Sequence, residues 1–178
     1  MTDRVPLRIM GVDGASQLLG WALLEVGGPP DPRSQGRVRH LDSGWFRARG
    51  GTKYGRFASI DFELTRLFKR HRPKLVAIEN GFVRMGPRGN VQGALVLAES
   101  RGVCMVAAAR LGLEILEVTP GQAKKAVTGN GFADKLTVQR FVRALFRLEG
   151  ELQEDQADAI AIAFSAASKG PRTDAGNR

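Results

Sequence analysis

Hydrophobic positions in roughly the first fifty residues fall in short runs that are separated by turn residues. Short apolar runs bounded by glycine or proline are typical of strands. Residues 7–13 and 18–26 fit this pattern, and residues 38–47 follow a loop rich in glycine and proline. Two more short runs, at residues 74–79 and 114–118, lie between longer segments. The chain is therefore predicted to contain five strands, with the third antiparallel to the second if the loop closes a hairpin.

Helical periodicity describes the segments between and after the later strands. Five apolar side chains recur at helical spacing within residues 55–71, and Pro73 ends that pattern. Further helices are predicted at residues 91–111, 120–127, 134–148 and 153–168. The first of these has small and apolar residues on most faces, as expected of a helix buried in a core or in a subunit interface. Three consecutive strands, followed by helices that alternate with two more strands, predict a three-layer α/β fold: a mixed five-stranded sheet with helices on both faces.

The length and composition predict a single domain. With 178 residues and 43% hydrophobic content, the chain can form one well-packed core but scarcely two. We assign residues 1–169 to this domain. Residues 170–178 are rich in glycine, proline, asparagine and charged residues, so this tail is expected to be disordered.

The charge and the cysteine content indicate the setting. Lysine and arginine number 27 against 18 aspartate and glutamate, which gives a net charge of +9. This charge favours a polyanionic partner such as nucleic acid but is also compatible with an ordinary soluble protein.

Cys104 lies in an apolar run and can form no internal disulfide, so we expect a core side chain in a protein of the reducing cytoplasm. No segment reaches the roughly 18 uninterrupted apolar residues of a membrane helix, so no membrane association is expected.

Four acidic residues at three separated places are the main candidates for chemistry. Asp13 and Glu79 each end an apolar run, while Asp155 and Asp158 lie three apart in the first turn of the last predicted helix. A carboxylate that ends a buried strand needs a partner, and several that converge need divalent cations to remain charged together. The set therefore predicts a metal-dependent phosphoryl-transfer site. Taken singly, Asp13 also fits an ordinary turn, and the two later aspartates also fit helix capping.

Zinc is not expected. His40 and His71 stand alone in the sequence, without the cluster of cysteine and histidine that zinc requires. We interpret both as exposed side chains beside basic residues.

The acidic residues lie within longer segments that form a recognisable set. These are Gly11-Val12-Asp13-Gly14-Ala15-Ser16, Val76-Ala77-Ile78-Glu79-Asn80-Gly81-Phe82 and Asp155-Gln156-Ala157-Asp158-Ala159-Ile160-Ala161-Ile162-Ala163. Three further segments are Glu99-Ser100-Arg101-Gly102-Val103, Thr119-Pro120-Gly121-Gln122-Ala123-Lys124-Lys125 and Gly129-Asn130-Gly131-Phe132-Ala133-Asp134-Lys135. In order and spacing, the six segments resemble the motifs of the RuvC family of Holliday-junction resolvases over about residues 7–168. One departure is Gly14-Ala15, where the family usually has Pro-Gly; the carboxylate is retained, and we do not expect the change to abolish catalysis.

The resemblance implies a ribonuclease-H-like fold in which the first and fourth strands and the last helix bring the acids together. It implies that the catalytic metal ligands are Asp13, Glu79, Asp155 and Asp158, holding two Mg²⁺ or Mn²⁺ ions that would activate a water and stabilise the leaving 3′ oxygen. Lys124 and Lys135 fall where the family has basic residues near the site. They are expected to bind the scissile phosphate or to act in its chemistry, although each also fits a solvated helix face.

Other residues are candidates for DNA binding. Phe82 falls where the family has an aromatic residue that stacks on a base near the crossover, although a phenylalanine after a strand is also typical of a core. Arg84 and Arg88 belong to the basic loop that follows and are expected to contact DNA phosphates. Further candidates for phosphate contacts, with a solvated surface position as the alternative, are Arg47, Arg49, Lys53 and Arg56.

These observations lead to one principal function and two alternatives. The principal hypothesis is a homodimeric crossover junction endodeoxyribonuclease that makes paired, symmetry-related nicks in a four-way DNA junction and leaves ligatable 5′-phosphate and 3′-hydroxyl ends. Helix 91–111 is the candidate for the dimer interface, and the resemblance implies cooperation with a branch-migration motor of the RuvA and RuvB type in recombination and repair. The alternatives are a nuclease of the same fold for other branched DNA or RNA–DNA hybrids, and a module that binds branched DNA without cutting it.

Overall fold

The sheet contains the five predicted strands and one short additional strand. The computed structural model describes residues 5–14, 16–27, 34–35, 37–81 and 91–169. The strands are β1 (Leu7–Asp13), β2 (Leu18–Val26), β3 (Ser34–Gln35), β4 (Val38–Arg47), β5 (Leu75–Glu79) and β6 (Glu114–Val118). Their order is β3-β4-β2-β1-β5-β6, in which β5 pairs in parallel with β1 and β6 while the other neighbours are antiparallel. The mixed sheet is confirmed, and β3 is added because two residues are too few to show a strand pattern in the sequence.

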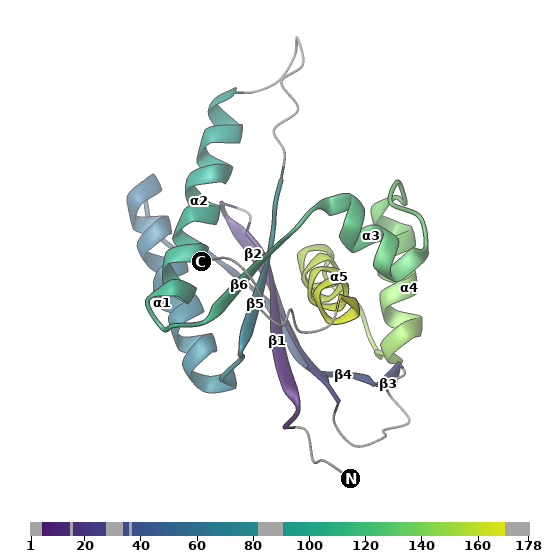
Figure 1. Ribbon diagram of the computed structural model, residues 1–178. Coiled ribbons are helices and arrows are strands. Elements are labelled where there is room, and N and C mark those ends of the chain that lie inside the picture. Colours follow the sequence, from purple (N-terminus) through teal and green to yellow (C-terminus); the bar gives the residue numbers. More distant parts are fainter. Residues whose placement is uncertain (1–4, 15, 28–33, 36, 82–90, 170–178) are drawn as a thin grey trace, which may run out of the picture.

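Helices cover both faces of this sheet. In the described part of the chain they are α1 (Lys53–His71), α2 (Val91–Ala109), α3 (Pro120–Thr128), α4 (Lys135–Phe146) and α5 (Glu154–Ser168). α1 and α2 lie on one face, whereas α3, α4 and α5 lie on the other (Figure 1). The three-layer α/β fold is therefore confirmed, with helix boundaries within about two residues of those predicted. α5 packs directly against β1 and β2, so its acidic first turn lies close to the sheet.

Side chains along each strand point alternately to the two faces of the sheet, so the core consists of two apolar clusters, one on each face. The same alternation determines the face toward which two acidic side chains point. Ile9 and Ala77 belong to the apolar cluster that includes α5, whereas Met10 belongs to the cluster that includes α1 and α2. Successive side chains of a strand point to opposite faces of the sheet. Asp13 in β1 and Glu79 in β5 therefore point to the face covered by α5.

The helices that carry the candidate lysines begin at capped residues. The hydroxyl of Thr119 accepts the backbone N–H of Gln122 (3.2 Å), and the Gln122 side chain accepts the backbone N–H of Thr119 (3.1 Å). The carboxylate of Asp134 accepts the backbone N–H of Thr137 (2.7 Å) at the start of α4. These bonds satisfy N–H groups that have no partner inside the helix. They fix where α3 and α4 begin.

α2 is more exposed than a core helix. By length and composition alone α2 is apolar enough to cross a membrane, and 22% of its apolar stretch is buried in the domain. Glu99 and Arg101 interrupt this stretch, so it is not the uninterrupted apolar run that was sought in the sequence. Its two charged residues have polar partners in the same domain: Glu99 pairs with Lys53 at 2.9 Å, and Arg101 donates to Asn80 at 2.9 Å. Cys104 on the inner side of α2 is fully buried, which confirms its predicted core position. These contacts tie α2 to the domain, while apolar side chains such as Leu95 and Val106 on its outer side are exposed.

Candidate active site

Two acidic residues end neighbouring parallel strands. β1 and β5 pair with Val12 opposite Ile78, so Asp13 and Glu79 are the next residues on the two strands. Both residues are partly buried, and both side chains point toward α5. The fold therefore places two carboxyl groups beside each other at one edge of the sheet.

Two glycines allow the start of α5 to approach these strand ends. Gly20 of β2 pairs with Asp13, and a Cβ atom at Gly20 would overlap the backbone carbonyl of Asp155. A turn further along α5, a Cβ atom at Gly11 would overlap the carbonyl oxygen of Ala159. Only glycine permits so close a contact between a strand and a helix backbone. The acidic first turn of α5 is thus held against the ends of β1 and β2.

The environment of Asp13 favours its protonated form. Burial, followed by the charges of Glu79, Asp158 and Asp155, raises the pKa of Asp13 from an ordinary 3.8 to about 8, and Lys135 lowers it only in part. Burial also raises the pKa of Glu79, as does the charge of Asp158, while a side-chain hydrogen bond with Asp13 lowers it. These directions are consistent with a proton on Asp13 that is donated to Glu79. Burial and the neighbouring carboxylates therefore both favour a proton on Asp13.

Asp158 belongs to the same electrostatic cluster. Burial raises its pKa most, and the nearby carboxylates of Glu154 and Asp155 raise it further. Lys135 and then Lys124 oppose this shift. The α5 carboxylates therefore interact with those at the strand ends, so the structure brings together all four acids singled out in the sequence.

The donor set suits a hard divalent cation. All four side chains offer carboxylate oxygens, the ligands preferred by Mg²⁺ and Mn²⁺, and their mutual repulsion is the kind that a cation relieves. Among the described residues, no three Asp, Glu, His or Cys side chains are already arranged in metal-ligand geometry. A cation would compete with the proton that burial favours on Asp13.

The raised pKa values predict how stability depends on pH. The folded protein holds a proton on Asp13 that the unfolded chain releases near pH 4, so the free energy of unfolding should fall as the pH rises from about 4 to about 8. Without divalent cations, we expect the melting temperature to be lower at pH 9 than at pH 6 by more than about 2–4 °C, the shift for roughly 1 kcal/mol in a domain of this size.

Calorimetry at both pH values, with and without millimolar Mg²⁺, tests this expectation. Mg²⁺ should raise the melting temperature more at pH 9, where the carboxylates are free of protons, and Asp13→Asn should reduce the pH dependence. An unchanged pH dependence in Asp13→Asn would contradict the assignment of the proton to Asp13.

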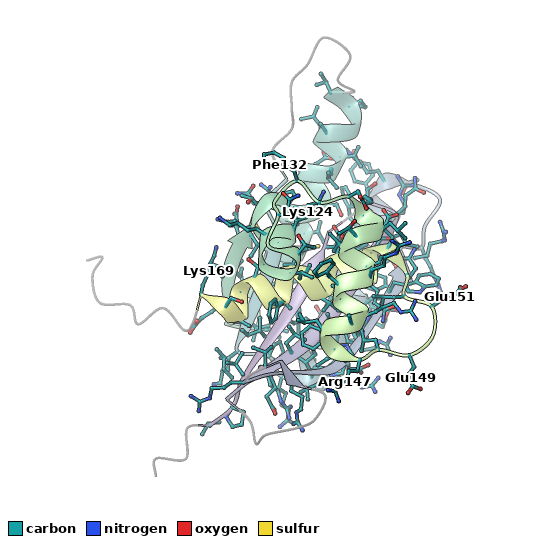
Figure 2. The ribbon with its side chains drawn as sticks, turned by 90° about the vertical axis from the view of Figure 1, so that its right-hand side faces the viewer. Lys124, Phe132, Arg147, Glu149, Glu151 and Lys169 are labelled. Carbon is teal, nitrogen blue, oxygen red and sulfur yellow. The ribbon has the colours of Figure 1, made fainter. Side chains whose placement is uncertain are left out.

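The two candidate lysines flank the carboxylates. Lys135, the first residue of α4, forms an ion pair with Glu154, and its charge lowers the pKa of Asp13, Glu79 and Asp158. Lys124 of α3 lowers the pKa of Glu79 and Asp158. Figure 2 shows Lys124 beside the turn that leads from α3 into α4. Both ammonium groups are therefore placed to attract a phosphate that approaches the acids.

Arg101 and Asn80 are site residues to which the sequence analysis assigned no role. Arg101 Nη1 donates to Asn80 Oδ1 at 2.9 Å, and Asn80 directly follows Glu79. Arg101 also lines a cavity of about 170 Å³ together with Glu79, Gly14 and Leu97. The sequence contained a sign of this contact, because Arg101 lies within a predominantly apolar helix, where an arginine is expected to reach a polar partner. This cavity extends the site from the carboxylates toward α2.

Not all expected DNA contacts can be placed. Phe82, Arg84 and Arg88 lie outside the described residues. Among the further phosphate candidates, Arg47 and Arg49 are exposed and available, whereas Lys53 is engaged by Glu99. Among the described cations, Lys124 and Lys135 act on the acids electrostatically, and Arg101 lines the cavity that includes Glu79.

The two histidines correct an expectation from the sequence. His71 is buried and stacks against Trp21 with ring centroids 5.2 Å apart. His40 is half-buried, and its Nε2 lies 2.8 Å from Ser43 Oγ. Burial lowers the pKa of both, so they act as neutral structural side chains. The prediction of exposed histidines was wrong because the apolar sides of α1 and β4 include them.

Comparisons with known proteins agree with this arrangement. The family model described as crossover junction endodeoxyribonuclease RuvC matches residues 9–166. The crossover junction endodeoxyribonuclease RuvC of Marinobacter nauticus is 39% identical over 157 residues, which is 88% of this chain and 83% of that protein. The protein of the same name from Chromohalobacter salexigens is 36% identical over 157 residues, covering 88% and 78% respectively. The structure of Thermus thermophilus RuvC in complex with a Holliday junction substrate is similar with a TM-score of 0.76 and 26% identity, over 90% of this chain and 93% of that one.

Proposed function

This chain belongs to the RuvC family of crossover junction endodeoxyribonucleases, and from that premise we propose that it resolves four-way (Holliday) DNA junctions by metal-dependent cleavage of phosphodiester bonds. The observation that carries the proposal is the convergence of Asp13, Glu79 and the acidic first turn of α5. A net charge of +9 favours a DNA substrate. The related Thermus thermophilus protein has been solved with a Holliday junction substrate.

Each acid has a role in this proposal. The residues that would hold the cations are Asp13, Glu79, Asp155 and Asp158. RuvC-family enzymes are metal-dependent nucleases, and two Mg²⁺ or Mn²⁺ ions bound here would supply an activated water and stabilise charge on the leaving 3′ oxygen. Asp13 is central because the charges of all three other carboxylates act on its pKa. Its proton must leave before a cation binds, so cation binding should strengthen as the pH rises toward 8.

The lysines orient the substrate. Lys124 and Lys135 lie on the α3–α4 side of the carboxylates, and their ammonium groups would bind the oxygens of the scissile phosphate. Lys135 is paired with Glu154, so the phosphate would compete with that carboxylate for the ammonium group. In this arrangement the acids hold the cations and the lysines bring the phosphate to them.

A second copy of the chain is the proposed partner of α2. Residues Leu95 and Val106 are three helical turns apart and each is 54% exposed, and the small residues Ala98 and Gly102 lie between them on the same side. The buried residues Ser100 and Cys104 face the domain instead. A junction with two-fold symmetry is matched by two active sites related by the same symmetry. The apolar stripe therefore fits a self-complementary dimer contact.

Charged substitutions in this stripe should separate the dimer. We expect Leu95→Glu combined with Val106→Glu to convert a dimer into a monomer and to prevent paired nicking, because it buries two like charges per copy at a two-fold contact. The matched control is Phe141→Glu, which changes an exposed side chain of α4 (47% exposed). Analytical ultracentrifugation checks the result. A monomeric unmodified protein at micromolar concentration, both alone and with junction DNA, would contradict the dimer.

Cooperation with a branch-migration motor of the RuvA and RuvB type is supported by family membership alone. No described surface is assigned to that contact.

Substrate choice is tested by comparing labelled DNAs under identical conditions. A mobile four-way junction, a linear duplex and an RNA–DNA hybrid of the same sequence should be incubated with Mg²⁺ or Mn²⁺. Cleavage of the junction in preference to the other two is expected. Preference for the hybrid would favour a different nuclease of the same fold, and tight junction binding without cleavage would favour a binding module.

A further inference from the structure

Phe132 is an exposed aromatic residue close to the candidate lysines. It is 95% exposed, and Leu136, which follows it at helical spacing in the first turn of α4, is 56% exposed. Phe132 precedes Lys135 by three positions in the sequence. Figure 2 shows Phe132 near Lys124, whereas Arg147 and Glu149 lie toward the opposite end of α4. The ring is therefore presented to solvent at the end of the α3–α4 unit that carries both lysines.

The backbone that presents Phe132 is fixed on both sides. The N–H of Phe132 donates to Asn130 Oδ1 at 3.0 Å. On the following side, Ala133 is buried in the cluster that includes α5, and its N–H donates to the Asn130 carbonyl at 3.3 Å. Gly131 packs against the backbone at the start of α3, where an added Cβ would lie 3.1 Å from the carbonyl oxygen of Gly121. Because the backbone at this position is already fixed, only the side chain of Phe132 has to be ordered when it binds a partner.

The same turn is bonded to the backbone of Lys124. The hydroxyl of Thr128 donates to the Lys124 carbonyl (2.8 Å) and accepts the N–H of Asn130 (3.1 Å). Gly129 allows the reversal of direction with a φ of 77°. The turn thus links the position of Lys124 to that of Phe132.

The charges around Phe132 favour a nucleic-acid partner. Lys124, Lys125 and Lys135 are cationic, while the acidic residue nearest in sequence, Asp134, is occupied with the N–H and hydroxyl of Thr137. A flat apolar ring among cations is complementary to a DNA strand, in which phosphates alternate with bases. A protein surface would have to be acidic around an apolar pocket to match it equally well.

We propose that Phe132 stacks on a nucleobase of the strand whose scissile phosphate is held by Lys124 and Lys135, and so acts as a second aromatic contact that positions the strand for cleavage. This proposal rests on the proposed junction-cleaving function and is independent of Phe82. It assigns the α3–α4 turn to the recognition of the nucleotides beside the cut.

The test uses a junction with 2-aminopurine at each of several positions near the cleavage site, one position per DNA. Binding is measured with the Asp13→Asn protein, which should not cleave, with and without Phe132→Ser. At one position, Phe132 should quench the 2-aminopurine fluorescence, and Phe132→Ser should remove that quenching and weaken binding about tenfold, within the range for one stacked base. Phe132→Trp should retain both effects. Phe141→Ser, in another exposed phenylalanine of α4, is the matched control.

Cleavage and oligomeric state distinguish the possible failures. With Asp13 intact, Phe132→Ser should slow single-turnover junction cleavage about tenfold while its melting temperature stays that of the unmodified protein. Unchanged quenching, binding and cleavage in Phe132→Ser, with the unmodified protein active on junctions, would overturn the proposal for Phe132 alone. Loss of the dimer in Phe132→Ser would also overturn it, because the ring would then serve a protein contact. An unmodified protein that does not cleave junctions would overturn the proposed function and this inference together.

Discussion

Replacing Asp13 with asparagine should reduce junction cleavage roughly a thousandfold or more and leave junction binding nearly unchanged. The pKa of Asp13 is raised by burial and by the charges of all three other acids, and its replacement would remove a proposed metal ligand. Loss of several kcal/mol of metal-dependent stabilisation corresponds to a rate reduction of this size. Lys124 and Lys135, the proposed phosphate ligands, are unchanged in this variant, so binding should remain. Single-turnover cleavage and junction binding measured on the same preparation check both parts.

The matched control for Asp13 is Asp61→Asn. Asp61 lies on α1, where it forms an exposed ion pair with Arg110 at 3.2 Å, away from the strand ends. This variant should cleave at the rate of the unmodified protein. Cleavage by Asp13→Asn within a few-fold of that rate would show that the carboxylate cluster is not the catalytic centre.

Replacing Gly20 with alanine should both destabilise the domain and remove cleavage. The added Cβ would overlap the backbone of Asp155, so α5 would have to move away from β1 and β2 and carry its acidic turn with it. Overpacking of this kind costs about 1–3 kcal/mol or more. Without the close contact, alanine in a strand would be more stable than glycine by about 0.5–1 kcal/mol. A decrease in the free energy of unfolding of Gly20→Ala would therefore show that the close contact exists, and an increase would show that it does not.

Gly51→Ala provides the control for this substitution. A Cβ atom at Gly51 meets nothing within 4 Å, so the change should leave both the melting temperature and cleavage near their original values. Chemical denaturation and single-turnover cleavage of the two variants give the comparison. A Gly20→Ala protein as stable and active as Gly51→Ala would show that α5 does not depend on the glycine for its position.

Most helices and strands could be predicted from the sequence, because the hydrophobic pattern along each of them matches the side that packs in the core. The apolar runs of β1 and β5 end in acids, so their parallel pairing alone brings Asp13 and Glu79 together. The roles of Gly11 and Gly20 were not predicted, because a close approach between a strand and a helix depends on which helix covers that face. The contact between Arg101 and Asn80 was missed for the same reason.

Other differences arise where tertiary structure overrides a local pattern. α4 was predicted to end at residue 148, but it ends at Phe146 because Arg147 takes a left-handed conformation with a φ of 49°. No glycine marks this end, and the N–H of Leu148 bonds back to the Arg143 carbonyl at 3.0 Å. His71 could have been recognised as buried, since it continues the helical spacing of Leu64 and Phe68 on the inner side of α1.

Mapping of the cut positions on a labelled four-way junction tests the central claim most directly. Each strand of the junction should be labelled in turn, incubated with the protein and Mg²⁺ or Mn²⁺, and then treated with DNA ligase. We expect two nicks at symmetry-related positions, dependent on the cation and on Asp13, which the ligase reseals because the ends are 5′-phosphate and 3′-hydroxyl. Cation-independent cutting, or nicks that fall equally on a linear duplex of the same sequence, would contradict it.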